Sequence, residues 1–228
     1  MIDKYGELSL RDKIFSFFIL TIPITLISGP FLPDLCISLC AIFFLFKNDD
    51  KKFYKNYFLF LFIFFCIIII ISSLINFELS SLKSSLFYFR FGFFSLFFWY
   101  LIEKNNQILD RLYLILLLIF FILIFDSVFQ YFNGFNIFGM KIAEEGRISS
   151  FFGDELKLGS YLFRLFPLLA SLIFLQYSKK KKKNFLFIFF ILILFLEIAI
   201  FLSGERTSFL LFNFTVILFL IFLNKIKI

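Results

Sequence analysis

Runs of apolar residues recur along the whole chain and are separated by short polar stretches. A helix needs about 20 mostly apolar residues to cross a bilayer, and fewer where its polar ends reach the interface. The pattern predicts eight membrane-spanning helices, at residues 14–27, 32–46, 57–75, 86–102, 112–129, 159–177, 185–202 and 208–223. The expected fold is an all-α polytopic helix bundle that forms one integral-membrane domain over residues 1–228.

The first two apolar runs are short, and only Ser28, Gly29, Pro30 and Pro33 interrupt them. They fit either two spans or one re-entrant hairpin, and both alternatives leave the sidedness of the later loops unchanged. No signal-peptide cleavage pattern follows the first run, so we expect it to stay attached.

Composition supports the membrane assignment, because 61% of the residues are hydrophobic and 44 are Phe. A soluble core does not hide that much apolar surface. The formal net charge of +7 needs no nucleic-acid partner, since basic residues beside a membrane face anionic lipid headgroups. The lysine run at residues 179–183 is then a cytoplasmic turn.

Basic residues orient the predicted bundle, because short loops rich in Lys and Arg stay in the cytoplasm. One set of ends and loops holds 16 of the 23 basic residues and the alternate set holds seven, which places both termini in the cytoplasm. Four of the six arginines fall in the outer set, namely Arg90, Arg147, Arg164 and Arg206. Arginine is a rigid fork that matches two phosphate oxygens at once, so this skew favours an outward-facing anion site.

Several other kinds of chemistry lack their usual residues. The chain has no His, and Cys36, Cys40 and Cys66 lie inside apolar runs, so we expect neither a metal site nor a cofactor. It also lacks a Gly-rich phosphate loop, a nucleophile elbow, an HExxH pattern and the matched interrupted helices of secondary transporters.

The predicted external loop at residues 130–158 is much longer than the other connections. Long loops in compact proteins are usually functional or disordered, and a plain tether is the alternative here. Its glycines and charged residues lead directly into the next apolar run, which favours a functional loop.

Two strings at the outer ends of predicted spans are similar to motifs of one family. GRISSFFGDELKLGSYLFRLFPLLASL at residues 146–172 and LSGERTSFLLF at residues 202–212 resemble passages of the O-antigen ligase and O-antigen polymerase family. Members are multi-pass glycosyltransferases of the bacterial inner (cytoplasmic) membrane. The resemblance implies transfer of a glycan from an undecaprenyl-pyrophosphate carrier to a sugar acceptor at the periplasmic face, as in lipopolysaccharide biosynthesis.

The resemblance also assigns roles to individual residues. Arg147 and Arg206 fall on the motif arginines that hold the pyrophosphate, and Gly153 and Gly159 fall on its glycines. With Ser203 of the second string, the two glycines are candidate substrate-binding residues. The likeness covers the first two-thirds of the family's usual architecture, so a C-terminal half or polysaccharide-assembly proteins are expected partners.

Physical reasoning agrees for the two arginines, because fixed guanidinium groups stabilise the charge of a departing diphosphate without a metal. Arg90 is a third candidate contact, with snorkelling to the interface as its alternative. Asp126 is a weak candidate base for an acceptor hydroxyl, and the alternative is that it balances the charge of an arginine.

Arg164 and Glu197 lie inside predicted spans, each about 8 Å below the outer surface at 1.5 Å per residue. Charged side chains at that depth need partners, so we predict a structural salt bridge between them. A second class of function also remains open for the whole chain, namely a non-catalytic membrane component or carrier in polysaccharide export. Substitution of Arg147 or Arg206 by Lys separates the two classes.

Overall fold

The structure is a computed structural model that describes residues 9–47, 51–77, 79–142, 146–180 and 185–225. In these residues the regular structure is helical, apart from one β-bridge between Phe135 and Lys141. The predicted single domain divides into two compact units, unit 1 (Met1–Arg111) and unit 2 (Leu112–Ile228).

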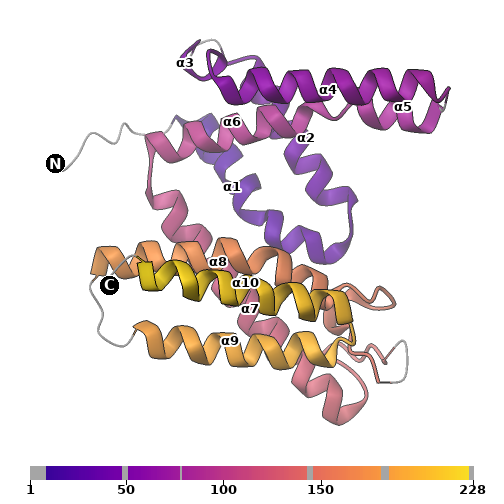
Figure 1. Ribbon diagram of the computed structural model, residues 1–228, viewed down its shortest axis with the longest axis vertical. Coiled ribbons are helices and arrows are strands. Elements are labelled where there is room, and N and C mark those ends of the chain that lie inside the picture. Colours follow the sequence, from indigo (N-terminus) through magenta and orange to yellow (C-terminus); the bar gives the residue numbers. More distant parts are fainter. Residues whose placement is uncertain (1–8, 48–50, 78, 143–145, 181–184, 226–228) are drawn as a thin grey trace. The chain divides into compact units, whose positions relative to one another are not determined.

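A helix lies at each of the predicted spans (Figure 1). These helices are α1 (Leu10–Thr25), α2 (Phe31–Leu45), α4 (Tyr57–Ile75), α6 (Phe89–Lys104), α7 (Gln107–Asn133), α8 (Leu158–Lys180), α9 (Phe185–Leu202) and α10 (Arg206–Lys225). Four short elements join them: η1 (Leu26–Ser28), α3 (Lys51–Tyr54), α5 (Leu79–Leu86) and η2 (Ser150–Phe152).

Within the described part of the chain, four helical stretches are long and apolar enough to cross a membrane. They are Tyr57–Ile75, Leu79–Lys104, Gln107–Asn133 and Leu158–Tyr177, and shorter apolar helices cover Phe31–Leu45, Phe189–Leu202 and Arg206–Phe222. The protein is therefore a helical membrane protein. That eight helices cross, and that both termini are cytoplasmic, stay predictions.

In unit 1, α1 and α2 form a hairpin that packs against α6, and α4 packs against α5 (Figure 1). Aromatic rings fill the contact between α2 and α6, where Phe44 and Phe97 are fully buried with ring centroids 5.8 Å apart. The helices of the hairpin have 16 and 15 residues. Each is about 23 Å long at 1.5 Å per residue, shorter than the hydrocarbon core, so the re-entrant alternative stays open.

The segment expected to link the third and fourth spans is not a loop. It forms α5 after a tight turn in which Phe77 has φ 50°, and a break at residues 87–88 separates it from α6. Leu79, Leu82 and Leu86 recur at helical spacing among serines. Apolar content alone does not reveal this amphipathic pattern. The fourth span was predicted to begin at residue 86, which is the last residue of α5, whereas α6 begins at Phe89.

The two ends of unit 1 carry different ion pairs. Asp12 is wholly buried and pairs with Lys47, while Lys104 lies 4.0 Å away and the Tyr100 hydroxyl donates to it at 3.3 Å. Burial by itself raises the pKa of Asp12, but hydrogen bonds from Lys47 and Ser9 and the two lysine charges outweigh burial and lower that pKa below its usual value.

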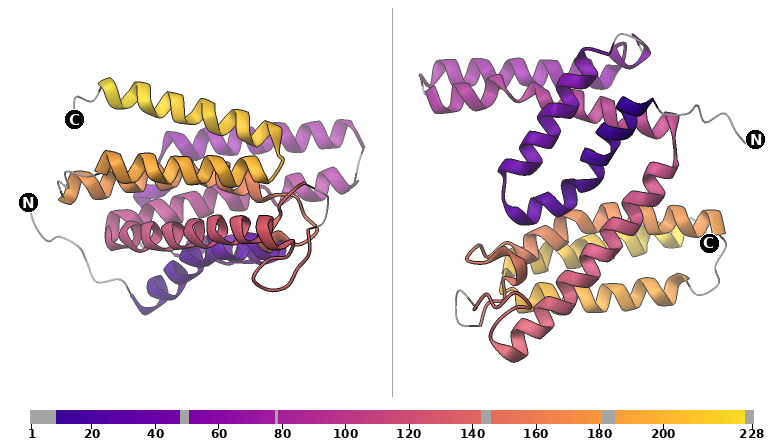
Figure 2. Two further views of the ribbon diagram at one scale, coloured as in Figure 1. Left: turned by 90° about the horizontal axis from the view of Figure 1, so that it is seen from below. Right: turned by 180° about the vertical axis from the view of Figure 1, so that it is seen from behind.

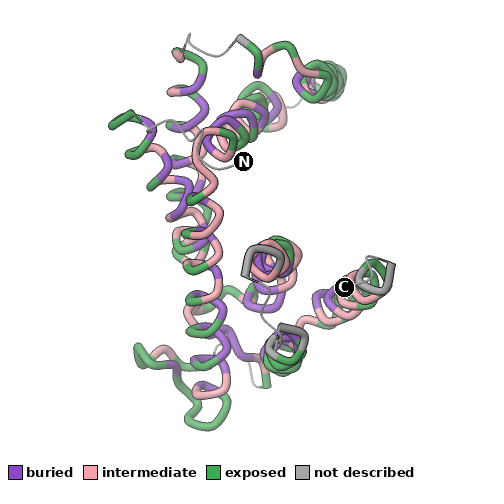
Figure 3. The backbone as a smooth tube through the Cα atoms, turned by 90° about the vertical axis from the view of Figure 1, so that its left-hand side faces the viewer, coloured by how far each residue is buried: buried purple, intermediate pink, exposed green. Residues whose placement is uncertain are grey.

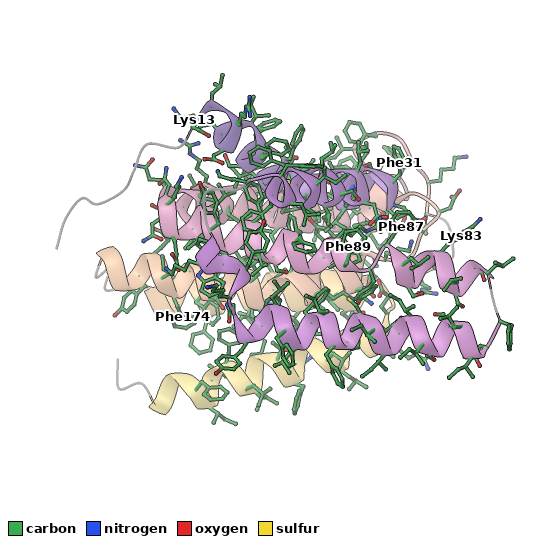
Figure 4. All side chains as sticks on the ribbon, turned by 90° about the horizontal axis from the view of Figure 1, so that it is seen from above. Lys13, Phe31, Lys83, Phe87, Phe89 and Phe174 are labelled. Carbon is green, nitrogen blue, oxygen red and sulfur yellow. The ribbon has the colours of Figure 1, made fainter. Side chains whose placement is uncertain are left out.

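The opposite end of unit 1 has Arg90 paired with Asp34, at 2.6 Å between Nη2 and Oδ2. Figure 4 shows the same separation, with Lys13 at one end of this unit and Phe31 and Lys83 at the other. This grouping agrees with the sides that the charge pattern assigns, because Lys47 and Lys104 belong to the predicted cytoplasmic set and Arg90 and Lys83 to the outer set.

In unit 2, α8, α9 and α10 pack side by side (Figures 1 and 2). Figure 3 looks nearly along these helices and shows buried residues on the sides that face one another. Phe166 of α8 is fully buried at the centre, with its ring centroid 4.8 Å from that of Phe212 and 6.2 Å from that of Phe189. This apolar packing fixes the helix ends that carry the candidate site.

Candidate functional site

The loop before α8, the start of α8 and the turn between α9 and α10 meet at the end of α9. In the loop, the backbone N–H of Ile148 donates to the carbonyl of Leu202 at 3.0 Å. The preceding side chain, Arg147, lies over Gly204, where an added Cβ would be 2.8 Å from Cγ and 3.1 Å from Nε of the arginine. Gly204 also has φ 70°, so both space and backbone require glycine. Arg147 therefore lies on the α9–α10 turn (residues 203–205), which leads directly to Arg206.

Glu205 joins this turn to the start of α8. Its carboxylate accepts hydrogen bonds from the backbone N–H groups of Gly159 at 2.8 Å and Ser160 at 3.0 Å. The hydroxyls of Ser160 and Ser208 donate to it as well. The N-terminal N–H groups of a helix have no partner within the helix and carry partial positive charge, so the anionic side chain stabilises the first turn of α8.

Gly159 permits this close approach. A Cβ at this position would lie 2.5 Å from Oγ of Ser203 and 3.1 Å from Oε1 of Glu205. Ser203 is itself buried, and its hydroxyl donates to the carbonyl of Ile200 and accepts the N–H of Glu205 at 3.4 Å. The geometry gives Gly159 and Ser203 structural tasks at the turn, and their predicted contact with substrate stays a prediction.

The long loop is folded over the end of α7 by buried polar side chains. Asp126 accepts hydrogen bonds from the Ser150 hydroxyl and, at 2.9 Å, from the backbone N–H of Ile137. Gln130 accepts from the backbone N–H of Ser150 at 2.7 Å, and Asn136 donates to the Ser150 carbonyl at 3.0 Å. These bonds hold the loop at fixed points along its length, which a plain tether does not need.

This network also answers the two interpretations of Asp126. The residue is fully buried and both of its carboxylate oxygens accept hydrogen bonds from the loop. In the described residues, no ion pair joins Asp126 to an arginine. The geometry therefore favours neither a general base nor a counter-ion, but an anchor for the loop.

The predicted bridge between Arg164 and Glu197 is absent from the described part of the chain. The buried stripe of α8 runs through Leu162 and Phe166, and Arg164 is two positions from each, so it points to the other side of the helix and is exposed. Glu197 lies beside the packed face of α9 and is partly exposed. The depth of both residues along their helices suggested the pair, but the rotation of α8 prevents it.

The remaining predicted positions have other surroundings. Gly153 ends η2 with φ 60°, and a Cβ there would meet only Sδ of Met140, at 3.8 Å. Arg90 belongs to unit 1, where Asp34 is its ion partner. No group of three or more His, Cys, Asp and Glu side chains that fits a metal ion occurs among the residues that the structure describes.

Sequence reasoning missed the residues that build the turn and the loop anchor, namely Gln130, Asn136, Ser150, Ser160, Glu205 and Ser208. Glu205 lies between Gly204 and Arg206 in the LSGERTSFLLF string, and the resemblance assigns it no role. The sequence did carry a signal for Gln130, which is a polar residue at the end of an otherwise apolar helix. A polar side chain that is buried at such a position needs a hydrogen-bond partner.

Comparisons of the chain with family models, with curated proteins and with solved structures found no match.

Proposed function

We propose that this chain is a membrane glycosyltransferase of the O-antigen polymerase or ligase type. It moves a glycan from undecaprenyl pyrophosphate to a sugar hydroxyl at the periplasmic face of the bacterial inner membrane. The two sequence strings that resemble that family support the proposal. The single observation that carries it is that Arg147, from the first string, lies on the turn that begins the second string and leads to Arg206.

The charges around this turn suit a diphosphate. Glu205, the carboxylate beside Arg206, is engaged by N–H and hydroxyl donors of α8 and α10. Within the described ranges, no carboxylate lies at ion-pair distance from the exposed Arg206. Arg206 is exposed, and its guanidinium group can donate hydrogen bonds to two phosphate oxygens.

In the proposed reaction, the acceptor hydroxyl oxygen forms a bond to the anomeric carbon of the glycan. The bond between that carbon and the pyrophosphate oxygen breaks, the electron pair leaves with undecaprenyl pyrophosphate, and the acceptor proton passes to solvent water. Negative charge builds on the departing diphosphate, and Arg147 and Arg206 stabilise it in the transition state. Asp126 has no part in this proposed proton transfer, because its carboxylate is buried and accepts hydrogen bonds from the loop.

A non-catalytic carrier of the same lipid diphosphate is a second candidate. The observation that favours it is the burial of Asp126, the candidate base, whose two carboxylate oxygens already accept hydrogen bonds from the loop. Such a protein binds the diphosphate through the same two arginines and transfers no glycan.

The test uses Arg147→Lys and Arg206→Lys. The matched control is Arg164→Lys, because Arg164 is exposed on the side of α8 that faces away from α9 and α10. Membranes that contain each variant are supplied with undecaprenyl-pyrophosphate glycan and an acceptor, and product is measured. Each of the first two variants should lose at least about tenfold in transfer, because lysine keeps the charge but not the two-pronged contact. The control should retain transfer.

Binding of undecaprenyl pyrophosphate separates the two candidate functions. Transfer by the wild-type chain with loss in both site variants supports the enzyme. Binding that falls in both variants, with no transfer by any form of the chain, supports the carrier. Equal transfer and equal binding in all forms would rule out both.

A further inference from the structure

Ser150 has an unusual backbone for its residue type. Its φ is 53°, in the left-handed region where a side chain crowds the backbone, and it is fully buried. Conformations of this kind persist only where the surroundings determine them strongly, and they concentrate at functional sites.

All three polar groups of Ser150 are bound by side chains that are themselves fully buried. Its hydroxyl donates to Asp126, its N–H donates to Gln130 at 2.7 Å, and its carbonyl accepts from Asn136 at 3.0 Å. Asn136 is held in turn, because its Oδ1 accepts the N–H groups of Phe138 and Met140 at 3.0 and 2.8 Å. We call Asp126, Gln130 and Asn136 with Ser150 the Ser150 clamp.

The clamp is only three residues from Arg147. Between them, Ile148 is buried and donates its N–H to Leu202 at 3.0 Å, and Ser149 is buried as well. The stretch from Arg147 to Ser150 is thus fixed at one end to α7 and at the other to the α9–α10 turn. A chain this short has little freedom between two fixed points, so the position of Ser150 limits where Arg147 lies.

We infer that the Ser150 clamp positions Arg147 against the α9–α10 turn and that Asp126 is a positioning residue for this arginine. The consequence for catalysis rests on the proposed function, whereas the placement of the arginine does not. Release of the clamp should let residues 147–149 leave the turn while α8, α9 and α10 stay packed through their apolar faces.

Tryptic cleavage after Arg147 reports this placement directly and needs no activity. Trypsin must draw the bond between Arg147 and Ile148 into an extended form, which requires Ile148 to leave its buried site. Asp126→Asn and Ser150→Ala in the purified full chain should speed this cleavage about tenfold or more, because each removes a buried hydrogen bond that involves a charged acceptor. Ser150→Gly should speed it less than Ser150→Ala, since glycine adopts a positive φ without strain.

Two control variants change side chains that, within the described part of the chain, form no hydrogen bond or ion pair with the clamp. Asn133→Ala removes an exposed amide that donates to Phe129 on the same helix, and Asp154→Asn removes an exposed carboxylate of the same loop. Both should cleave at the wild-type rate. Unchanged cleavage in Asp126→Asn and Ser150→Ala would overturn the inference, and so would equal acceleration in the controls.

The kinetic arm asks whether the clamp acts through Arg147. If it does, Asp126→Asn lowers the turnover number for glycan transfer, and addition of Arg147→Lys lowers it by less than twofold more. The alternative is that Asp126→Asn lowers the turnover number only because less protein is folded. Arg147→Lys would then have the same effect in the Asp126→Asn variant as in the wild type, and that result would contradict the positioning role.

The two proposals fail in different ways. Faster cleavage in the clamp variants, together with a wild-type chain that transfers no glycan, defeats the proposed function and supports the placement. Normal transfer that depends on Arg147, together with unchanged cleavage in the clamp variants, supports the function and defeats the clamp.

Discussion

Replacement of Gly159 by Ala tests the packing of α8 on the α9–α10 turn. A methyl group at this position would lie 2.5 Å from Oγ of Ser203, and Glu205 atoms at 3.1 and 3.2 Å leave little room on the other side. The start of α8 must therefore move away from the turn. That movement stretches the hydrogen bonds from Gly159 and Ser160 to Glu205, which are 2.8 and 3.0 Å long.

Three terms set the change in the free energy of unfolding of Gly159→Ala. Alanine is favoured over glycine in a helix by about 1 kcal/mol, which stabilises the variant. Overpacking costs about 2 kcal/mol, and weakening a hydrogen bond to a charged acceptor costs about 2 kcal/mol more. The free energy of unfolding of unit 2 should fall by about 3 kcal/mol, since the two unfavourable terms exceed the helix term.

The assay is a denaturant titration in mixed micelles, followed by far-ultraviolet circular dichroism. Gly134→Ala is the matched control, because no atom lies within 4 Å of its added Cβ and only its φ of 77° opposes alanine. That control should cost about 1–2 kcal/mol. Addition of Ser203→Ala removes the nearest clashing atom and should recover at least about 1 kcal/mol of the Gly159→Ala loss. The reasoning would be refuted if the effects of Gly159→Ala and Ser203→Ala on the free energy of unfolding were strictly additive and Gly159→Ala cost no more than Gly134→Ala.

Two further predictions concern the buried carboxylate of unit 1. Asp12→Asn leaves the mostly buried Lys47 without its partner and should lower the free energy of unfolding by about 3 kcal/mol, measured by a thiol-reactive dye on the buried Cys36, Cys40 and Cys66 of the same unit. The effect should depend on pH, because the pKa of Asp12 is lower in the folded chain than in the unfolded one. The stabilisation is therefore complete above about pH 4, the usual pKa of the unfolded group, and is lost as the pH falls through the folded value. Wild type should lose stability at acid pH more steeply than Asp12→Asn, and parallel pH profiles would show that Asp12 is not the group responsible.

Sequence alone determined where the long helices lie, because the free energy of apolar burial and the length of a bilayer span depend on composition within one segment. The separation of Lys47 and Lys104 from Arg90 at the two ends of unit 1 agrees with the alternation that the charge pattern predicted. Family-like strings also led to Arg147 and Arg206, whose segments meet at one turn. Phosphate binding by these two residues stays a prediction.

Partners of individual polar side chains were decided by the tertiary structure. Arg164 and Glu197 have similar depths along neighbouring helices, yet the rotation of α8 sends the arginine to the other side. Asp126, for which the sequence left a base and a counter-ion to an arginine as alternatives, accepts hydrogen bonds from the loop, and Glu205, to which the sequence assigned no role, binds the start of α8. Helical position follows from local preference and hydrophobicity, which each segment carries by itself. Hydrogen-bond partners depend on how helices rotate and approach, and only the packed chain sets that geometry.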